Sequence, residues 1–128
     1  FPTRRSSDLM QWQSPEAERI FPIVQDAFEK GKVIGGICNA ASFLCAHGFL
    51  NHVKHTGNTL AVLKQWGGER YTNEDGYLEK QAVGDKNIVT ANGTGYLEFT
   101  RELLLALKAD TQEKIEAFYD FSKNGLVR

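Results

Sequence analysis

The stretch Val33-Ile34-Gly35-Gly36-Ile37-Cys38-Asn39-Ala40-Ala41 decides the fold. A short apolar run, typical of a buried parallel strand, ends at a cysteine, and a segment of helical character follows at once. Small residues stand two positions before the cysteine (Gly36) and two after it (Ala40), which gives G-x-C-x-A, the cysteine counterpart of the G-x-S-x-G nucleophile elbow. A strand-to-helix turn this sharp brings its flanking residues together, so both must be small. The pattern predicts that Cys38 projects from the apex of a turn with strained backbone angles.

A cysteine at such an apex faces the first free N–H groups of the following helix, and these favour the thiolate. The thiolate is both the nucleophilic and the oxidisable form of the side chain. The alternative is a buried structural cysteine at the end of a strand, because free cysteines are among the most buried residues. The motif alone leaves both interpretations open. Cys45, on the predicted helix, is expected to be buried and nearly inert.

Four blocks resemble the ThiJ/PfpI (DJ-one) superfamily of the class I glutamine amidotransferase-like proteins. The elbow at Gly31–Ala40 is the first, and three later blocks follow in the order of that superfamily: Gly48–Thr56, Asn87–Gly95 and Leu97–Phe99. The resemblance implies a flavodoxin-like, three-layer α/β sandwich with a mainly parallel sheet. It does not imply one activity, because the superfamily includes hydrolases, glyoxalase-like enzymes, chaperones and redox sensors.

The resemblance also implies a site around Cys38. His55 is the candidate base, because it lies in a short segment whose end approaches the thiol in many members. His47 is expected to cap a helix and His52 to be solvated in a loop. The glutamate and the "P-G-G" loop that the superfamily places near its cysteine do not occur in this sequence. Pocket and oxyanion positions are expected at Gly36, Asn39, Ala40, Asn58, Gly93 and Thr94.

The first nine residues, Phe1 to Leu9, read like a common sequencing adapter translated in one frame. We interpret them as an assembly scar rather than as a natural basic, serine-rich tip. Residues 10–128 are then the C-terminal part of a single ThiJ/PfpI domain whose N-terminal strands are missing. We expect a chain without those strands to aggregate or to fold loosely, and to lack activity.

Composition and the lack of certain motifs exclude several classes of protein function. The chain has 128 residues, of which 41% are hydrophobic and 24% charged, and its net charge is −1, as expected for one packed domain. The sequence lacks the excess of Lys and Arg that would indicate nucleic-acid binding. No apolar run is long enough to span a membrane. No metal-spaced cluster, phosphate loop or dinucleotide motif appears, so we expect no cofactor and no metal. Two cysteines without a disulfide framework favour a reducing, cytoplasmic compartment.

Periodicity and turn residues predict an alternation of helices and strands. Ser14-Pro15 begins a helix and Gly31 ends it. The other expected elements are a strand over 33–37, a helix over 40–47, a short strand over 53–56, a helix over 59–65, strands over 77–83 and 88–91 around a turn at 84–87, and helices over 96–107 and 111–123.

Two function hypotheses follow. The first is a cysteine-dependent hydrolase, amidotransferase-like or glyoxalase-like enzyme that acts on a small carbonyl or amide compound, with Cys38 as nucleophile. The second is a non-enzymatic stress or redox-sensing protein that oxidises the same cysteine reversibly. A structural partner domain is a third reading, because no base is evident. The expected partner is a small molecule, and the resemblance implies a homodimer in the full-length parent.

Overall fold

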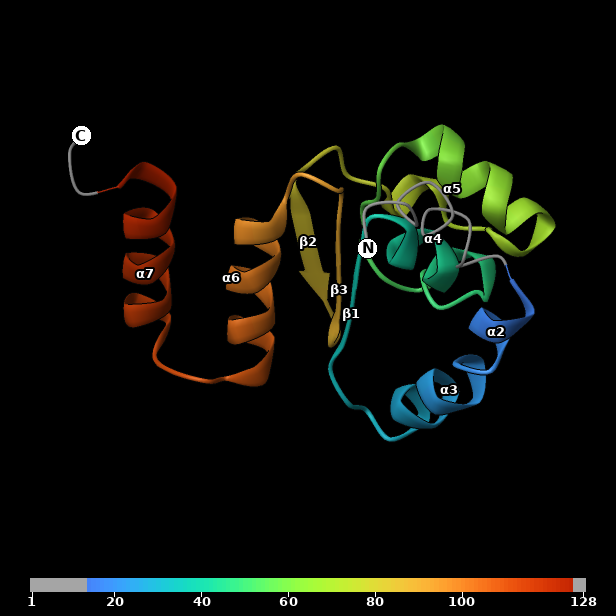
Figure 1. Cartoon of the computed structure of the whole chain (residues 1–128), viewed down its shortest axis with the longest axis horizontal. Helices are drawn as coiled ribbons and strands as arrows, with labels where there is room; N and C mark the ends of the chain where they lie inside the picture. The colour runs from blue at the N-terminus through green and yellow to red at the C-terminus, as the bar shows by residue number, and fades with distance from the viewer. Residues whose placement is uncertain (1–13, 126–128) are drawn as a thin grey trace.

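The computed structural model describes residues 14–125; residues 1–13, which include the proposed adapter segment, and 126–128 lie outside the described part. Figure 1 shows the arrangement of the elements. In chain order they are α2 (Pro15–Glu18), α3 (Phe21–Glu29), β1 (Ile34–Ile37), α4 (Asn39–Ala46), α5 (Leu60–Gly67), the 3₁₀ turns η2 (Gly68–Arg70) and η3 (Glu74–Gly76), β2 (Ala82–Asp85), β3 (Ile88–Ala91), α6 (Tyr96–Leu107) and α7 (Gln112–Asn124).

Three strands form one sheet in the order β1-β3-β2. β1 runs parallel to β3, with Ile34 opposite Ile88, and β2 runs antiparallel to β3. The two residues between β2 and β3, Lys86 and Asn87, have φ values of 50° and 69°, the left-handed geometry that suits a tight hairpin. The described sheet is therefore mixed, with one parallel and one antiparallel pair, and β1 lies at its edge.

Helices cover both faces of the sheet, as an α/β sandwich requires. In Figure 1, α6 and α7 lie on one side of the sheet and α2 to α5 on the other. α6 contacts all three strands, and α7 packs against α6 as an outer layer. On the opposite face α3 and α4 contact β1, while α5 packs against α4. This layering places β1 between the helices of the two faces, and α4 begins directly after the carboxyl end of β1.

The core lies mainly between the sheet and α4. Its cluster contains apolar residues from β1, α4, the segment after α4, α5 and β3. The largest fully buried apolar side chains include Phe43, Leu50 and Leu63. Burial of side chains of this size stabilises the fold by about 1.5–3 kcal/mol each. The packing of Phe43 and its neighbours therefore fixes the position of α4 against β1, the strand that leads to Cys38.

Several expected elements differ from those observed. The helix that begins at Pro15 stops at Glu18, and α3 begins at Phe21, because Pro22 has no N–H to continue the hydrogen-bond ladder. The expected strand over 53–56 is reduced to an isolated bridge between His55 and Tyr77. The strand expected from Tyr77 begins only at Ala82. By contrast, the strand over 88–91 and the helix over 96–107 have the predicted bounds.

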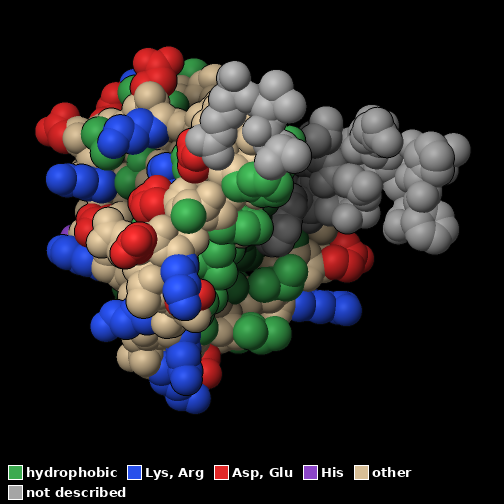
Figure 2. Space-filling model, turned by 90° about the vertical axis from the view of Figure 1, so that its left-hand side faces the viewer, with side chains coloured by type: hydrophobic (Ala, Val, Ile, Leu, Met, Phe, Trp, Pro, Cys, Tyr) green, Lys and Arg blue, Asp and Glu red, His purple; other side chains and the backbone are tan. Residues whose placement is uncertain are grey.

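Hydrophobic side chains remain exposed on several helices. Ile23 on α3 is 70% exposed, and Phe118 and Phe121 on α7 are each about half exposed. Figure 2 views the side that carries α7 and shows hydrophobic side chains gathered into one area of that face. No helix within residues 14–125 is both long enough and apolar enough to cross a membrane.

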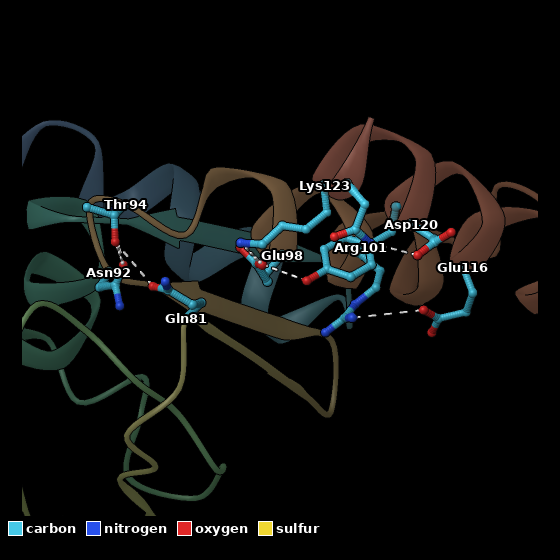
Figure 3. Close-up of polar contacts among 10 residues, drawn as sticks. Gln81, Asn92, Thr94, Glu98, Arg101, Glu116, Asp120 and Lys123 are labelled. Atoms are coloured by element: carbon cyan, nitrogen blue, oxygen red, sulfur yellow. Dashed lines mark hydrogen bonds and ion pairs between the residues drawn. The ribbon is translucent and has the colours of Figure 1, made fainter. Parts of the chain in front are cut away.

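A buried carboxylate joins the two helices of the outer layer. Glu98 on α6 accepts a hydrogen bond from the Tyr119 hydroxyl at 2.6 Å and pairs with Lys123 Nζ at 2.9 Å, both on α7 (Figure 3). Burial by itself raises the pKa of Glu98, but the bonds from Lys123 and Tyr119 outweigh that effect and lower it to about 2. The charged form of Glu98 therefore helps to hold α7 against α6.

This pair predicts a loss of stability in acid. The pKa of Glu98 is 4.5 without these contacts and about 2 in the fold, so its contribution is present above pH 4.5 and is lost as pH falls toward 2. We expect that contribution to be about 2 kcal/mol, since Lys123 is partly exposed. Urea unfolding at pH 7 and pH 3 should show a smaller pH effect for Glu98→Gln than for the parent chain. Glu113→Gln, an exposed change on α7, is the control and should retain the parent's pH effect.

Candidate active site

Cys38 lies at the apex of the turn between β1 and α4. Its backbone angles are φ 60° and ψ −126°, a conformation that side-chain-bearing residues rarely adopt. The predicted elbow geometry is therefore confirmed. The Cys38 N–H donates to the carbonyl of Ala91 at 3.0 Å, which ties the apex to the end of β3. The thiol itself is half-buried.

The small residues around the apex have the expected steric role. A Cβ atom built on Gly36 would lie 2.8 Å from Leu44 Cδ1 and 3.1 Å from backbone atoms of Ala40 and Ala41. The first turn of α4 thus passes directly against β1, and Gly36 leaves the space for it. Asn39, the first residue of α4, follows the cysteine directly, and Ala40 lies beside Gly36.

Parallel pairing brings a second segment to the thiol. Because β1 and β3 are parallel, their carboxyl ends meet at one edge of the sheet, and the loop after β3 lies beside Cys38. A Cβ atom built on Gly93 would lie 3.3 Å from Cys38 Sγ, so glycine lets this loop approach the sulfur. The predicted pocket position of Gly93 is therefore next to the thiol.

Asn58, from the segment before α5, joins the thiol to that loop. Its Nδ2 donates to Cys38 Sγ at 3.3 Å, and its Oδ1 accepts the N–H of Gly93 at 2.9 Å. One side-chain amide thus bridges the apex of the elbow and the loop after β3. A donor at this distance stabilises negative charge on the sulfur.

The loop donors that the sequence suggested for an oxyanion are already engaged. The Gly93 N–H is held by Asn58, and the Thr94 N–H donates to Asn92 Oδ1 at 3.0 Å. The Thr94 hydroxyl contacts the side-chain oxygens of Asn92 and Gln81 rather than the thiol (Figure 3). Thr94 therefore shapes the loop. Among the expected donors, the Asn39 backbone N–H is the one nearest to the nucleophile in sequence.

The structure does not bring His55 to Cys38. His55 is fully buried, its Nδ1 lies 2.8 Å from the Val53 carbonyl, and its Nε2 lies 2.7 Å from the Tyr71 hydroxyl. Both ring nitrogens are occupied, so the imidazole cannot take a proton from the thiol in this arrangement. Burial lowers the pKa of His55, and its hydrogen bond to Val53 opposes this only partly. The expected general base is therefore not found at His55.

The other two histidines also lie away from the thiol. His47 ends α4, as predicted, but its ring stacks on Phe21 and its Nε2 lies 2.9 Å from the Glu18 carboxylate. His52 is exposed in a loop. Within residues 14–125 no group of three His, Cys, Asp or Glu side chains is arranged to hold a metal ion.

Cys45 occupies a different environment from Cys38. It is fully buried on α4, and its thiol donates to the Leu63 carbonyl at 3.3 Å. Burial raises its pKa to about 12. Cys45 is therefore inaccessible in the core, as the sequence predicted, whereas Cys38 is half-buried at the elbow.

A cavity of about 700 Å³ opens beside Asn58, and Cys38 is not among the residues that line it. Tyr77 and Leu60 supply apolar surface, and the carboxamides of Gln81 and Asn92 supply polar groups. The sequence did not indicate this cavity. Its lining comes from three segments that are distant in sequence, with the side chains of Gln81 and Asn92 brought together through Thr94.

An α/β sandwich with a cysteine at a nucleophile elbow defines a class of proteins that carry a reactive residue between a parallel strand and a helix. Comparison with known families specifies the class further. Residues 11–106 match the profile of the DJ-1/PfpI family, and the chain belongs to that family. The superfamily suggested by the elbow and the three later blocks is thereby confirmed.

Curated relatives agree with this assignment. Over 112 residues, 88% of this chain, it is 39% identical to a Bacillus subtilis (strain 168) protein named "Uncharacterized protease YdeA" and 34% identical to another named "Uncharacterized protease YoaZ" from the same strain. These matches cover 56% and 53% of the relatives. The chain thus spans about half the length of the curated relatives it matches.

Solved structures support the fold. A ThiJ/PfpI family protein from Bacillus anthracis has a TM-score of 0.82 and 31% identity over 88% of this chain and 53% of its own. A DJ-1 superfamily protein from Agrobacterium tumefaciens has a TM-score of 0.72 and 35% identity over 80% of this chain and 54% of its own. The ThiJ/PfpI-type α/β fold expected from the sequence is therefore confirmed.

Proposed function

We propose that the protein is a cysteine-dependent hydrolase in which Cys38 is the nucleophile and a small carbonyl or amide compound is the substrate. The observation that carries the proposal is the strained apex geometry of Cys38, with φ 60°, at the carboxyl end of β1. Such strain persists only where the surrounding structure enforces it, and it is concentrated at functional sites. The relatives named as proteases support hydrolysis as the reaction class.

The chemistry would proceed in two balanced steps. The Cys38 thiolate attacks the substrate carbonyl carbon, a thioester forms at Sγ, and the amine or alcohol leaves after it takes a proton from water. Water then attacks the thioester, which releases a carboxylic acid and restores the thiol. Asn58 Nδ2 would hold the sulfur in place before attack, and the Asn39 N–H is the proposed donor to the oxyanion. The cavity would hold the part of the substrate beyond the reacting carbonyl, because Asn58 both lines the cavity and contacts Cys38 Sγ.

Acylation by an activated ester tests this proposal without knowledge of the natural substrate. When the whole protein is treated with p-nitrophenyl acetate, we expect a burst of p-nitrophenolate and an acetyl group on Cys38 Sγ, detected by peptide mass spectrometry, followed by its slow loss to water. Cys38→Ser should reduce the burst about a hundredfold, because an unactivated hydroxyl is a much weaker nucleophile. Cys45→Ser, at the buried thiol, is the matched control and should keep the burst. A burst that survives Cys38→Ser would contradict the proposal.

Redox sensing through the same cysteine is the second candidate. One observation favours it: in the described part of the chain, the side-chain hydrogen bond to Cys38 Sγ comes from a neutral amide, Asn58, and not from a base. A thiolate held by a donor without a base is suited to reversible oxidation by peroxide to a sulfenic acid, with water as the other product. Trapping of that acid by dimedone on Cys38, together with no acyl transfer, would favour sensing over hydrolysis.

Both candidates place the protein in a reducing compartment. Cys38 and Cys45 are both free thiols, and a cytoplasmic location is part of the proposal. Homodimer formation by the whole protein stays a prediction, as does the small-molecule partner.

A further inference from the structure

The buried pair of His55 and Tyr71 has no part in the proposed chemistry, although it is fully formed. The Val53 carbonyl can only accept a hydrogen bond, so His55 Nδ1 carries the proton and donates to it at 2.8 Å. Nε2 is then the acceptor for the Tyr71 hydroxyl, at 2.7 Å. The contacts fix one neutral tautomer in a site where neither residue is more than 8% exposed.

The surroundings of the pair favour its neutral state. The rings of Tyr77 and His55 meet edge to face, at a centroid distance of 6.2 Å. On the other side, the Cys45 thiol and the Glu74 carboxylate act on Tyr71, whose pKa is raised mainly by burial. Glu74 is itself paired with Lys64 at 3.3 Å. These are the titratable and charged groups that α4, α5 and the turns present to the pair.

The backbone of His55 is anchored on both sides. Its N–H donates to the Gly76 carbonyl at 3.0 Å, and its carbonyl accepts the N–H of Leu78 at 2.8 Å. The ring and the backbone together hold one end of the segment over residues 55–58 at a fixed position and orientation.

The same segment leads directly to the thiol. The Thr56 N–H donates to Thr90 Oγ1 at 2.8 Å on β3, and the Thr56 hydroxyl donates to the Lys80 carbonyl at 3.1 Å. Gly57 packs closely against Leu63, where an added Cβ would lie 2.9 Å away. Asn58 follows, with its amide on Cys38 and Gly93. A shift of His55 would therefore move the amide of Asn58, because only two tightly packed residues separate them in the chain.

We propose that the buried His55–Tyr71 hydrogen bond is a positioning element for the reactive thiol, which it holds through residues 56–58 by fixing the amide of Asn58 on Cys38. His55 acts at a distance through the chain and does not accept the thiol proton. The proposal rests on Cys38 as the reacting thiol of the proposed function.

The test measures the rate at which iodoacetamide alkylates Cys38, followed by peptide mass spectrometry. Tyr71→Phe removes only the hydroxyl that binds His55 and should lower the Cys38 rate about threefold to tenfold. Tyr96→Phe is the control, because it removes a hydroxyl from a tyrosine that is 64% exposed on α6, outside the His55–Tyr71 pair, and should leave the rate unchanged. An unchanged rate in Tyr71→Phe would overturn the proposal.

A double-mutant cycle separates positioning from a general loss of structure. If the pair acts through Asn58, Tyr71→Phe should have no further effect on the rate in an Asn58→Ala chain. An equal effect in both backgrounds would overturn the proposal, because a merely structural role would reduce the rate irrespective of residue 58. If circular dichroism shows that Tyr71→Phe does not fold, His55→Gln replaces it in the same cycle and carries the same two expectations.

A pH profile gives a readout that needs no substitution in the core. Protonation of His55 at Nε2 removes the acceptor for the Tyr71 hydroxyl, so the rate advantage of the parent chain over Asn58→Ala should fall toward one at pH values below 6.5. The imidazole NMR signals of His55 report when the ring gains its proton, and a ratio that stays constant across that transition would contradict the proposal. All of these rates use iodoacetamide alone. If Tyr71 and Asn58 are coupled in the iodoacetamide rates but the ester does not acylate Cys38, the hydrolase proposal is rejected and this inference stands. If the ester acylates Cys38 but the two residues are not coupled, this inference is rejected and the hydrolase proposal stands.

Discussion

Iodoacetamide at neutral pH is expected to alkylate Cys38 at least about a hundredfold faster than Cys45 in the folded chain. Cys38 is half-exposed at the elbow, whereas Cys45 is fully buried on α4 and its pKa is raised to about 12. With that pKa only ~10⁻⁵ of the Cys45 thiol is ionised at pH 7, and the thiolate is the form that reacts. Burial and ionisation therefore act in the same direction.

Mass spectrometry of the two cysteine peptides after short labelling times gives both rates from one sample. The chain unfolded in urea is the control, because both thiols are then exposed and should react at similar rates. Equal rates in the folded chain would show that Cys38 is no more accessible than a core cysteine. That result would remove the basis for both proposed functions.

Self-association through the edge of β1 is the second large effect that we expect. In the described part of the chain, β1 pairs with β3 alone. The N–H groups of Ile34 and Cys38 donate to the β3 side, at 2.8 and 3.0 Å. Since backbone groups alternate along a strand, those of Gly35 and Ile37 face away from β3, toward a side where no other strand of residues 14–125 lies. An unpaired edge beside apolar side chains is a template for association at micromolar to millimolar concentrations.

Sedimentation velocity over a range of concentrations should therefore show reversible or irreversible association of the 128-residue chain. Val33→Lys, next to the first residue of β1, should shift the chain toward monomer, because a lysine at a strand edge opposes pairing. Ile23→Lys adds the same charge to α3, at a side chain that is 70% exposed, and should leave the association unchanged. If Ile23→Lys is the change that restores the monomer, the apolar surface of α3 and not the edge is responsible.

The expected association also bears on the stability of the 128-residue chain. It spans about half the length of its relatives, and a longer chain that supplies a strand at the edge of β1 should remain monomeric or form a defined oligomer. Thermal unfolding of the two forms, compared at equal concentration, measures how much of the stability depends on that strand. A cooperative, monomeric 128-residue chain would contradict the prediction from the sequence that it folds loosely.

The sequence by itself determined the elbow. G-x-C-x-A after an apolar run implies a steric requirement that hardly depends on the rest of the fold, because only small residues allow a strand and a helix to meet at such an angle. The bounds of β3 and α6 were also predictable, since the turn residues before Ile88 and the helical spacing from Tyr96 are local signals; the turn itself is shorter than the predicted 84–87, because β2 continues to Asp85. The adapter interpretation of residues 1–9 stays a prediction, as that segment lies outside the described residues.

Only the tertiary structure decided which side chains meet the thiol. His55 and Asn58 are three residues apart and both are polar, and no local signal distinguishes the one that faces inward to Tyr71 from the one that reaches Cys38. That choice depends on how the segment over residues 55–58 is held between β3 and the turn at Gly76, which are long-range contacts. The prediction of a strand over 53–56 was wrong for the same reason. A strand needs a partner along its length, and here the pairing is limited to His55 and Tyr77. Local sequence fixed the shape of the turn that carries the cysteine, and packing between distant segments fixed the chemistry around it.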